Sequence, residues 1–210
     1  MKTPKNFLFD FGAVLLELDL DATLRAMRPL LGENYFFDYQ KNTFPPIFEQ
    51  YEIGAVDEAV FLETLQTLSV PGTTQDRLKI AWNVMLGPVP RRRLEMLLEL
   101  RKTHGVYLLS NTNATHLERV YRDFEKAGIH DWDERYFDQT YYSHLIGARK
   151  PDDAAYDHVL NDAGIKAPET LFIDDNPANI EAAIRLGFQT HLHNDGRDVL
   201  EVVAKNIPRR

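Results

Sequence analysis

Short runs of consecutive apolar residues, each followed by a polar residue or a turn, recur along the chain and predict the strands of a sheet. The clearest runs cover residues 7–9, 106–109 and 171–173, and weaker candidates cover residues 136–140 and 188–192. Continuous apolar runs are typical of parallel strands that are covered on both faces, whereas a strand with one solvated face alternates. We therefore expect these segments to form a buried parallel sheet.

Segments with helical spacing alternate with these strands. In residues 91–103, Leu94, Leu97 and Leu98 recur at helical spacing, and the pattern stops before Gly105. Residues 153–163 and 177–186 show the same behaviour and stop at glycines. Strands and helices in alternation predict an α/β fold with a doubly wound parallel sheet.

The stretch from about residue 20 to residue 86 breaks this alternation and is expected to form helices joined by loops. It is rich in aromatic residues, and Gly87-Pro88-Val89-Pro90 ends it like a linker. An insertion after the first strand predicts a core domain of residues 1–16 and 88–210 and a helical cap domain of residues 17–87. Most cap aromatics are expected in a hydrophobic core, while one or two could face a substrate: Tyr35, Phe44, Phe48 and Tyr51.

The composition narrows the class of protein. The 210 residues carry a formal net charge of −8, which argues against nucleic-acid binding because phosphate contacts need clustered lysine and arginine. The basic run at residues 91–93 is expected to be the solvated start of a helix. The chain has no cysteine, so disulfides and cysteine nucleophiles are excluded. No segment approaches the length of a membrane span, and we expect a cytoplasmic protein with no membrane partner.

Polar residues directly follow three of the predicted strands. They are Asp10, Ser110 and the pair Asp174-Asp175. Ligands of open parallel sheets bind beyond the carboxyl ends of the strands, so neighbouring strands would bring these side chains into one crevice. Carboxylates that lie so close raise each other's pKa unless a cation lies among them. Mg²⁺ is the expected cation because it prefers oxygen ligands, and Gly12 would let the backbone turn its carbonyl toward the metal.

Phosphoryl transfer is the chemistry that this set of residues supports. Asp10 is the candidate nucleophile, which would attack phosphorus and form an aspartyl-phosphate. Ser110 and the amide of Asn111, at a strand-to-helix turn, are candidate phosphate ligands. Lys150, in Arg149-Lys150-Pro151, would offer a positive charge to the phosphate oxygens and to Asp10.

The same residues resemble the four motifs of the haloacid dehalogenase superfamily, and the resemblance extends over essentially the whole chain. Residues 10–14 resemble motif I, residues 110–112 motif II, Lys150 with Pro151 motif III, and residues 174–176 motif IV. The resemblance implies a Rossmann-like core, a subfamily I helical cap inserted after the first strand and a small phosphorylated metabolite as substrate. It also implies that Asp10, the Gly12 carbonyl and Asp175 bind the metal, with Asp174 helping directly or through water.

A narrower resemblance concerns one branch of that superfamily. The sequences Ser-Asn-Thr-Asn, Arg-Lys-Pro and Asp-Asp-Asn, together with Glu52-Ile53-Gly54 in the cap, are similar to a branch of sugar-phosphate phosphatases. This branch includes an α-D-glucose-1-phosphate phosphatase. A sugar phosphate is therefore the substrate that the resemblance implies.

Position 12 departs from the usual pattern of these phosphatases. They carry a second aspartate two residues after the nucleophile, as general acid and base, where this chain has Gly12. General acid–base help is worth roughly 10²–10⁴-fold. Three outcomes are open: a cap residue or water takes the place of the missing aspartate, substrates with good leaving groups are preferred, or the activity is weak. The similar branch shares the glycine and still contains phosphatases, which favours retained activity.

Some of these residues have other interpretations. Asp19-Leu20-Asp21 also fits the motif I formula, but Glu17 interrupts the apolar run before it, so Asp19 or Asp21 is expected to cap a helix after a flap strand at residues 14–18. Asp174 and Asp175 would also suit a helix N-terminus, and Asn179 could orient them. His191 and His193 lie on one strand face, but no third metal ligand is evident near them.

Three rival functions remain on the sequence alone. A 2-haloacid dehalogenase would share the fold, but it needs no metal and is not expected to keep both Asp174 and Asp175. A mutase is disfavoured because it usually relies on the second aspartate that Gly12 replaces. A non-catalytic binding protein would have kept the fold and lost turnover.

Overall fold

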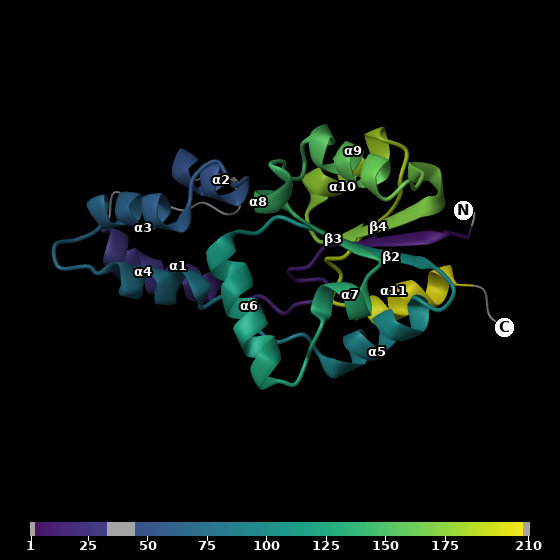
Figure 1. Cartoon of the computed structure of the whole chain (residues 1–210), viewed down its shortest axis with the longest axis horizontal. Coiled ribbons are helices and arrows are strands. Elements are labelled where there is room, and N and C mark those ends of the chain that lie inside the picture. Colours follow the sequence, from purple (N-terminus) through teal and green to yellow (C-terminus); the bar gives the residue numbers. More distant parts are fainter. Residues whose placement is uncertain (1–2, 33–44, 208–210) are drawn as a thin grey trace.

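A computed structural model describes residues 3–32 and 45–207. Within them, five parallel strands form one sheet in the order β3-β2-β1-β4-β5. The sheet is doubly wound, as predicted, and the strand that leads to Asp10 is at its centre (Figure 1). The strands are β1 (Asn6–Phe9), β2 (Gly105–Ser110), β3 (Gln139–Tyr142), β4 (Thr170–Asp174) and β5 (Gln189–Leu192).

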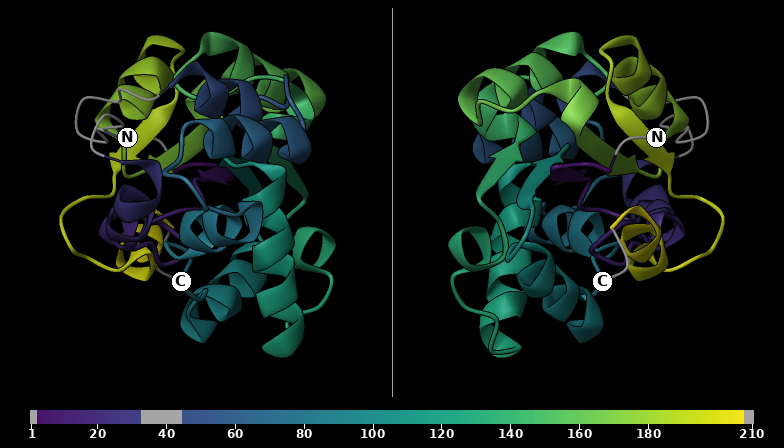
Figure 2. Two further views of the ribbon diagram at one scale, coloured as in Figure 1. Left: turned by 90° about the vertical axis from the view of Figure 1, so that its left-hand side faces the viewer. Right: turned by 90° about the vertical axis from the view of Figure 1, so that its right-hand side faces the viewer.

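Helices cover both faces of the sheet, which explains why its central strands are continuously apolar. Phe7 and Phe9 belong to a buried cluster on one face, and Leu8 belongs to the cluster on the other. The first face carries α5 (Arg91–Leu100), α6 (Ala114–Lys126), α7 (Trp132–Tyr136) and α11 (Val199–Asn206). The second carries α9 (Asp153–Asp162) and α10 (Pro177–Arg185), with α8 (Ser143–Ile146) and a 3₁₀ turn (Ala167–Glu169) nearby (Figure 2).

Among the described residues, four helices lie between β1 and α5 and pack beside the sheet at one end of the molecule (Figure 1). We call them the cap helices: α1 (Leu20–Leu31), α2 (Pro46–Glu52), α3 (Glu58–Thr67) and α4 (Gln75–Asn83). They have their own buried cluster, which contains Phe48, Tyr51 and Phe61. The aromatic residues of this region that the structure describes are thus core residues, while Tyr35 and Phe44 lie outside the described residues. The predicted domain boundaries at residues 17 and 87 stay a prediction.

Three expectations from the sequence differ from the structure. Tyr136 ends α7, and the strand begins only at Gln139. Residues 14–18 form no regular strand: only isolated bridges pair Gly12 with Leu16 and Leu18 with Leu86. Arg93 is buried, because its Nη1 donates to the carbonyl of Leu15 at 3.1 Å. It thereby anchors the segment that follows Asp10.

In the described part of the chain, no helix is both long and apolar enough to pass through a membrane.

Candidate active site

The carboxyl ends of β1 and β4 bring three carboxylates together. Phe9 is paired with Ile173, and the amide of Asp10 donates to the carbonyl of Ile173 at 2.9 Å, so Asp10 lies beside Asp174. One oxygen from each of Asp10, Asp174 and Asp175 lies within 4.8 Å of the others. Among the described residues, this is the one group of three or more acidic or histidine side chains with that spacing.

Lys150 lies buried in this cluster. Its Nζ is 2.6 Å from Oδ1 of Asp10 and 2.7 Å from Oδ2 of Asp174, and the residue is only 1% exposed. The side chain of Asn111 holds the backbone of Lys150 from both sides, since Nδ2 donates to its carbonyl at 2.8 Å and Oδ1 accepts from its amide at 2.9 Å. The structure thus brings together the residues predicted from three separate motifs, and it gives the Asn111 side chain a positioning role.

Burial makes the charges of this cluster depend on one another. Burial raises the pKa of Asp10 to about 7, although Lys150 opposes the shift; Asp174 and Asp175 add to it. Burial disfavours the charge on Lys150, but the two carboxylates outweigh this and raise its pKa. Burial and Asp174 also raise the pKa of Asp175. One ammonium group does not balance three carboxylates, so the site favours a further cation.

The carboxylates fit Mg²⁺ unequally. Both oxygens of Asp174 accept from Asn179 Nδ2 at 3.0 Å, Oδ1 also accepts from the amide of Asn176 at 2.8 Å, and Oδ2 pairs with Lys150. Asp175 makes no ion pair among the described residues, which leaves it the freer ligand. Asn179 thus holds the carboxylate of Asp174 in place, while the expected order, with Asp175 as a direct ligand and Asp174 helping directly or through water, stays a prediction. Asn176 provides the helix cap by accepting from the amide of Ala178.

The backbone of Gly12 does not have the positive φ that would by itself favour glycine in a turn at this position. The residue in the left-handed region is Ala13, with φ of +57°. A Cβ at position 12 would lie 2.5 Å from Cδ1 of Leu18, so the Leu18 side chain occupies the space beside this residue. The close contact is with the end of a flexible side chain, and the φ of Gly12 is not in the left-handed region, so neither feature by itself requires glycine there.

Ser110 ends β2 and is buried. The segment after it is held by Ser143, whose hydroxyl accepts from the amide of Thr112 and donates to its carbonyl, both at 2.9 Å. Asp19, the other candidate for motif I, is the N-cap of α1 and accepts from the amide of Ala22 at 2.9 Å. It therefore has the capping role that was expected.

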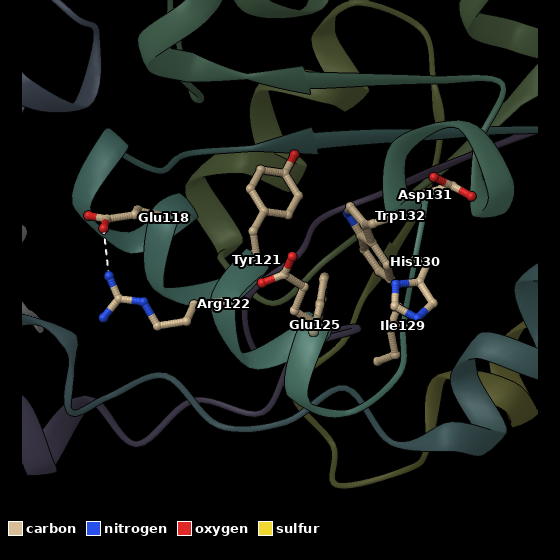
Figure 3. Close-up of a pocket in the computed structure, with 9 residues that line it drawn as sticks. Glu118, Tyr121, Arg122, Glu125, Ile129, His130, Asp131 and Trp132 are labelled. Atoms are coloured by element: carbon tan, nitrogen blue, oxygen red, sulfur yellow. Dashed lines mark hydrogen bonds and ion pairs between the residues drawn. The ribbon is translucent and has the colours of Figure 1, made fainter.

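A pocket of about 180 Å³ adjoins these residues. Gly12 and residues 110–113 line it from the sheet side, and Glu52 and Trp82 line it from the cap helices. A larger cavity of about 500 Å³ lies between α6 and the segment before α7 (Figure 3). It contains none of the predicted site residues, and two of its charged groups, Glu118 and Arg122, pair with each other at 2.6 Å.

Glu52 is a pocket residue whose contact the sequence did not reveal. Its Oε2 is 2.6 Å from Nε of Arg149, the residue before Lys150. Gly54 has φ of +70°, and a Cβ there would collide with the carbonyl oxygen of His144, which explains the glycine in the Glu-x-Gly element. The signal was present in the Glu-x-Gly and Arg-Lys-Pro motifs, but their contact joins residues about 100 positions apart.

The first turn of α6 connects the core to the cap helices. The amide of Thr115 donates to the Tyr51 hydroxyl at 3.0 Å, and the hydroxyl of Thr115 donates to Glu58 at 2.6 Å. Lys79 pairs with Glu118 at 2.8 Å. We call this group of contacts the α6 latch. It begins at Thr115, five residues after Ser110, so phosphate-binding candidates and cap contacts share one short segment.

His116 in the same turn is neutral, with a fixed tautomer. Its Nε2 lies 3.1 Å from the carbonyl of Trp82 and must donate, so Nδ1 accepts from Nδ2 of Asn113 at 3.3 Å. Burial lowers the pKa of His116 to about 4. Both ring nitrogens are occupied, which excludes His116 as a proton donor to a substrate.

The low pKa of His116 predicts a stability change with pH. The unfolded state takes up a proton near pH 6.5 and the folded state only near pH 4, so stability is lost as the pH falls through this window. The loss from this residue approaches about 3 kcal/mol. Urea unfolding between pH 7 and pH 4 should show it, and His116→Gln should remove this component. An unchanged pH dependence in His116→Gln would show that His116 is protonated in the folded protein.

Within the described ranges, His191 in β5 and His193 just after that strand do not belong to a group of three possible metal ligands. The rings of His191 and His193 are 6.1 Å apart, and no third ligand completes a cluster with them in the part of the chain that the structure describes.

Comparisons with known proteins agree with this geometry. The model of the family "haloacid dehalogenase-like hydrolase" matches residues 4–187. A D-ribitol-5-phosphate phosphatase from Bacteroides thetaiotaomicron is 32% identical over 197 residues, covering 92% of this chain and 94% of that protein. The crystal structure of a mutant HAD family enzyme from B. thetaiotaomicron, in complex with magnesium and inorganic phosphate, aligns with a TM-score of 0.86 at 31% identity, covering 95% of this chain and 98% of the other. A sesquiterpene phosphatase from Aspergillus oryzae is 26% identical, covering 88% of this chain and 87% of that protein.

Proposed function

The chain belongs to the haloacid dehalogenase-like hydrolases, and from this membership we propose that it is a Mg²⁺-dependent phosphatase of a small phosphorylated metabolite. The observation that carries the proposal is the cluster of Asp10, Asp174 and Asp175 around Lys150, at the carboxyl ends of neighbouring strands. A relative that binds magnesium and phosphate supports the same assignment.

Asp10 is the proposed nucleophile. Its carboxylate attacks phosphorus, the bond from phosphorus to the leaving oxygen breaks, and an aspartyl-phosphate forms, which water then hydrolyses. Lys150 donates a hydrogen bond to Asp10 and thereby holds the nucleophile in place and in its charged form. With Gly12 in place of a second aspartate, the leaving oxygen takes its proton from a group other than residue 12.

The remaining predicted residues bind metal and phosphate in this proposal. Asp10, Asp175 and the carbonyl of Gly12 hold Mg²⁺, with Asp174 beside them. When bound, Mg²⁺ supplies positive charge that offsets the charge developing on the phosphoryl group. The hydroxyl of Ser110 and the backbone amide of Asn111 bind phosphate oxygens, and Lys150 adds its charge.

The substrate class is the finer part of the proposal. We propose a phosphate ester of a sugar or alditol. The sequence motifs are similar to a branch with an α-D-glucose-1-phosphate phosphatase, and one relative is a D-ribitol-5-phosphate phosphatase. In both cases the phosphate is carried by an uncharged polyhydroxy compound. A cytoplasmic location is part of the same proposal.

The rival functions fit the site less well. A 2-haloacid dehalogenase needs no metal, and two carboxylates beside Asp10 would then be an electrostatic burden. A binding protein without turnover remains the alternative, because Gly12 replaces the aspartate that usually donates the proton to the leaving group. Measured turnover decides between this alternative and the phosphatase.

The test is phosphate release from a panel of sugar phosphates, alditol phosphates, nucleotides and p-nitrophenyl phosphate. We expect release with Mg²⁺ and a loss of at least about 100-fold after EDTA treatment, because the carboxylate cluster then lacks its cation. Readdition of Mg²⁺ should restore the rate. A folded protein that binds Mg²⁺ in calorimetry but releases phosphate from no substrate would be a binding protein.

A further inference from the structure

We propose that the pocket of about 180 Å³ lined by Gly12, residues 110–113 and Glu52 receives the leaving group of the phosphate ester and accepts uncharged alcohols only. In this proposal the Glu52 carboxylate makes the enzyme discriminate against esters whose leaving group carries a second negative charge. The inference rests on the proposed phosphatase activity and specifies which esters it takes. It concerns the groups that line the pocket, not the phosphate-binding residues.

Most polar side chains of the pocket already have partners within the protein. Asn111 uses both ends of its amide on the backbone of Lys150. Asn113 accepts from the amide of His116 at 3.0 Å and contacts its ring nitrogen, while His116 also contacts the carbonyl of Trp82. These three side chains therefore offer a leaving group few free hydrogen bonds and no positive charge.

The one charged side chain that lines the pocket in the described part of the chain is negative. Glu52 comes from the end of α2, and Arg149, which pairs with its Oε2, does not line the pocket. Burial raises the pKa of Glu52, and the positive charges of Arg149 and Lys150 oppose the shift. No lysine or arginine lines the pocket among these residues to receive a carboxylate or a second phosphate.

The size and walls of the pocket agree with a small uncharged group. A volume of about 180 Å³ corresponds to roughly six waters. The walls also include the apolar side chains of Leu16, Leu18 and Leu86. An anion there would lose its hydration without gaining a counter-charge, and it would lie near the carboxylate of Glu52.

Two matched substrate pairs test the inference. 2-Hydroxyethyl phosphate and 2-phosphoglycolate differ by a carboxylate in place of a hydroxymethyl group, and glucose 1-phosphate and glucose 1,6-bisphosphate differ by a second phosphate. In the wild type, kcat/KM should be on the order of 100-fold higher for the uncharged member, as for two like charges within about 6 Å in a partly buried site. Glu52→Gln should reduce this ratio at least tenfold.

Glu49→Gln is the matched control. Glu49 lies on the same helix and near the same arginine, at 3.8 Å from Nη1 of Arg149, but it is exposed and does not line the pocket. The same change of charge there should leave the substrate ratio unchanged. An equal reduction in both variants would show that the net charge near Arg149 matters and would overturn the role of Glu52.

The wild-type ratios test the pocket even if Glu52→Gln fails to fold. Equal kcat/KM within both pairs, or release from no member of either pair, would overturn the inference. Mg²⁺-dependent release from p-nitrophenyl phosphate in the same experiment would then show that the proposed phosphatase activity stands. Absence of that release as well would contradict the proposed function itself.

Discussion

Asp10→Asn should reduce phosphate release by at least about 10⁴-fold while the protein stays folded. The amide is a poor nucleophile toward phosphorus, so no aspartyl-phosphate forms, and loss of a nucleophile removes the step on which the others depend. The shape of the side chain is retained, so packing around β1 is preserved. Single-turnover release of phosphate from p-nitrophenyl phosphate with saturating Mg²⁺ measures the effect, and circular dichroism checks the fold.

Asp19→Asn is the matched control for this substitution. It makes the same chemical change in the other aspartate that fits the motif I formula. Asp19 caps α1, and asparagine caps a helix about as well as aspartate, so both stability and activity should be nearly unchanged. Activity lost in Asp19→Asn and kept in Asp10→Asn would reverse the assignment of the nucleophile.

Lys150→Met should lower the free energy of unfolding by about 3–5 kcal/mol at pH 8 in the absence of metal, in addition to impairing activity. The substitution keeps much of the side-chain volume but removes the ammonium group between Asp10 and Asp174, leaving two buried carboxylates close together. Proton uptake relieves part of this repulsion, so the loss should be smaller at pH 5. Urea unfolding at both pH values measures it.

Magnesium provides the second arm of this experiment. If Lys150 and Mg²⁺ neutralise the same carboxylates, saturating Mg²⁺ should restore part of the lost stability in Lys150→Met. Lys166→Met, at an exposed position, should change stability little. A Lys150→Met protein as stable as the wild type without metal would mean that Asp10 is already protonated in the wild type.

The sequence predicted the sheet well because its strands are buried on both faces. Residues 7–9, 106–109 and 171–173 lie in β1, β2 and β4, and the carboxylates after them meet as expected. Each of these strands has a local signal in the sequence, which is a run of apolar residues followed by a polar residue. The three carboxylates could therefore be predicted from strand ends alone, whereas Lys150 was predicted from the Arg-Lys-Pro motif.

The features that were missed depend on contacts between distant parts of the chain. Arg93 looks like part of a solvated basic run, but the carbonyl of Leu15 gives it a buried partner 78 positions away. Tyr136 looks like a strand residue because aromatic residues suit both a strand and a buried helix. The pairing of Glu52 with Arg149 likewise has no local signal. The helices of the cap could be expected as a group, but their packing could not.

The α6 latch has a consequence for how the protein can be altered. On the core side, the contacts come from one helical turn that includes Thr115 and Glu118; on the cap side, they come from Tyr51, Glu58 and Lys79. A cap with these three side chains in the same places would form the same contacts with α6 of the core. We therefore expect a relative's cap to pack on this core in the same way only if it keeps these three side chains, the Glu52–Arg149 pair and the contact of Trp82 with His116.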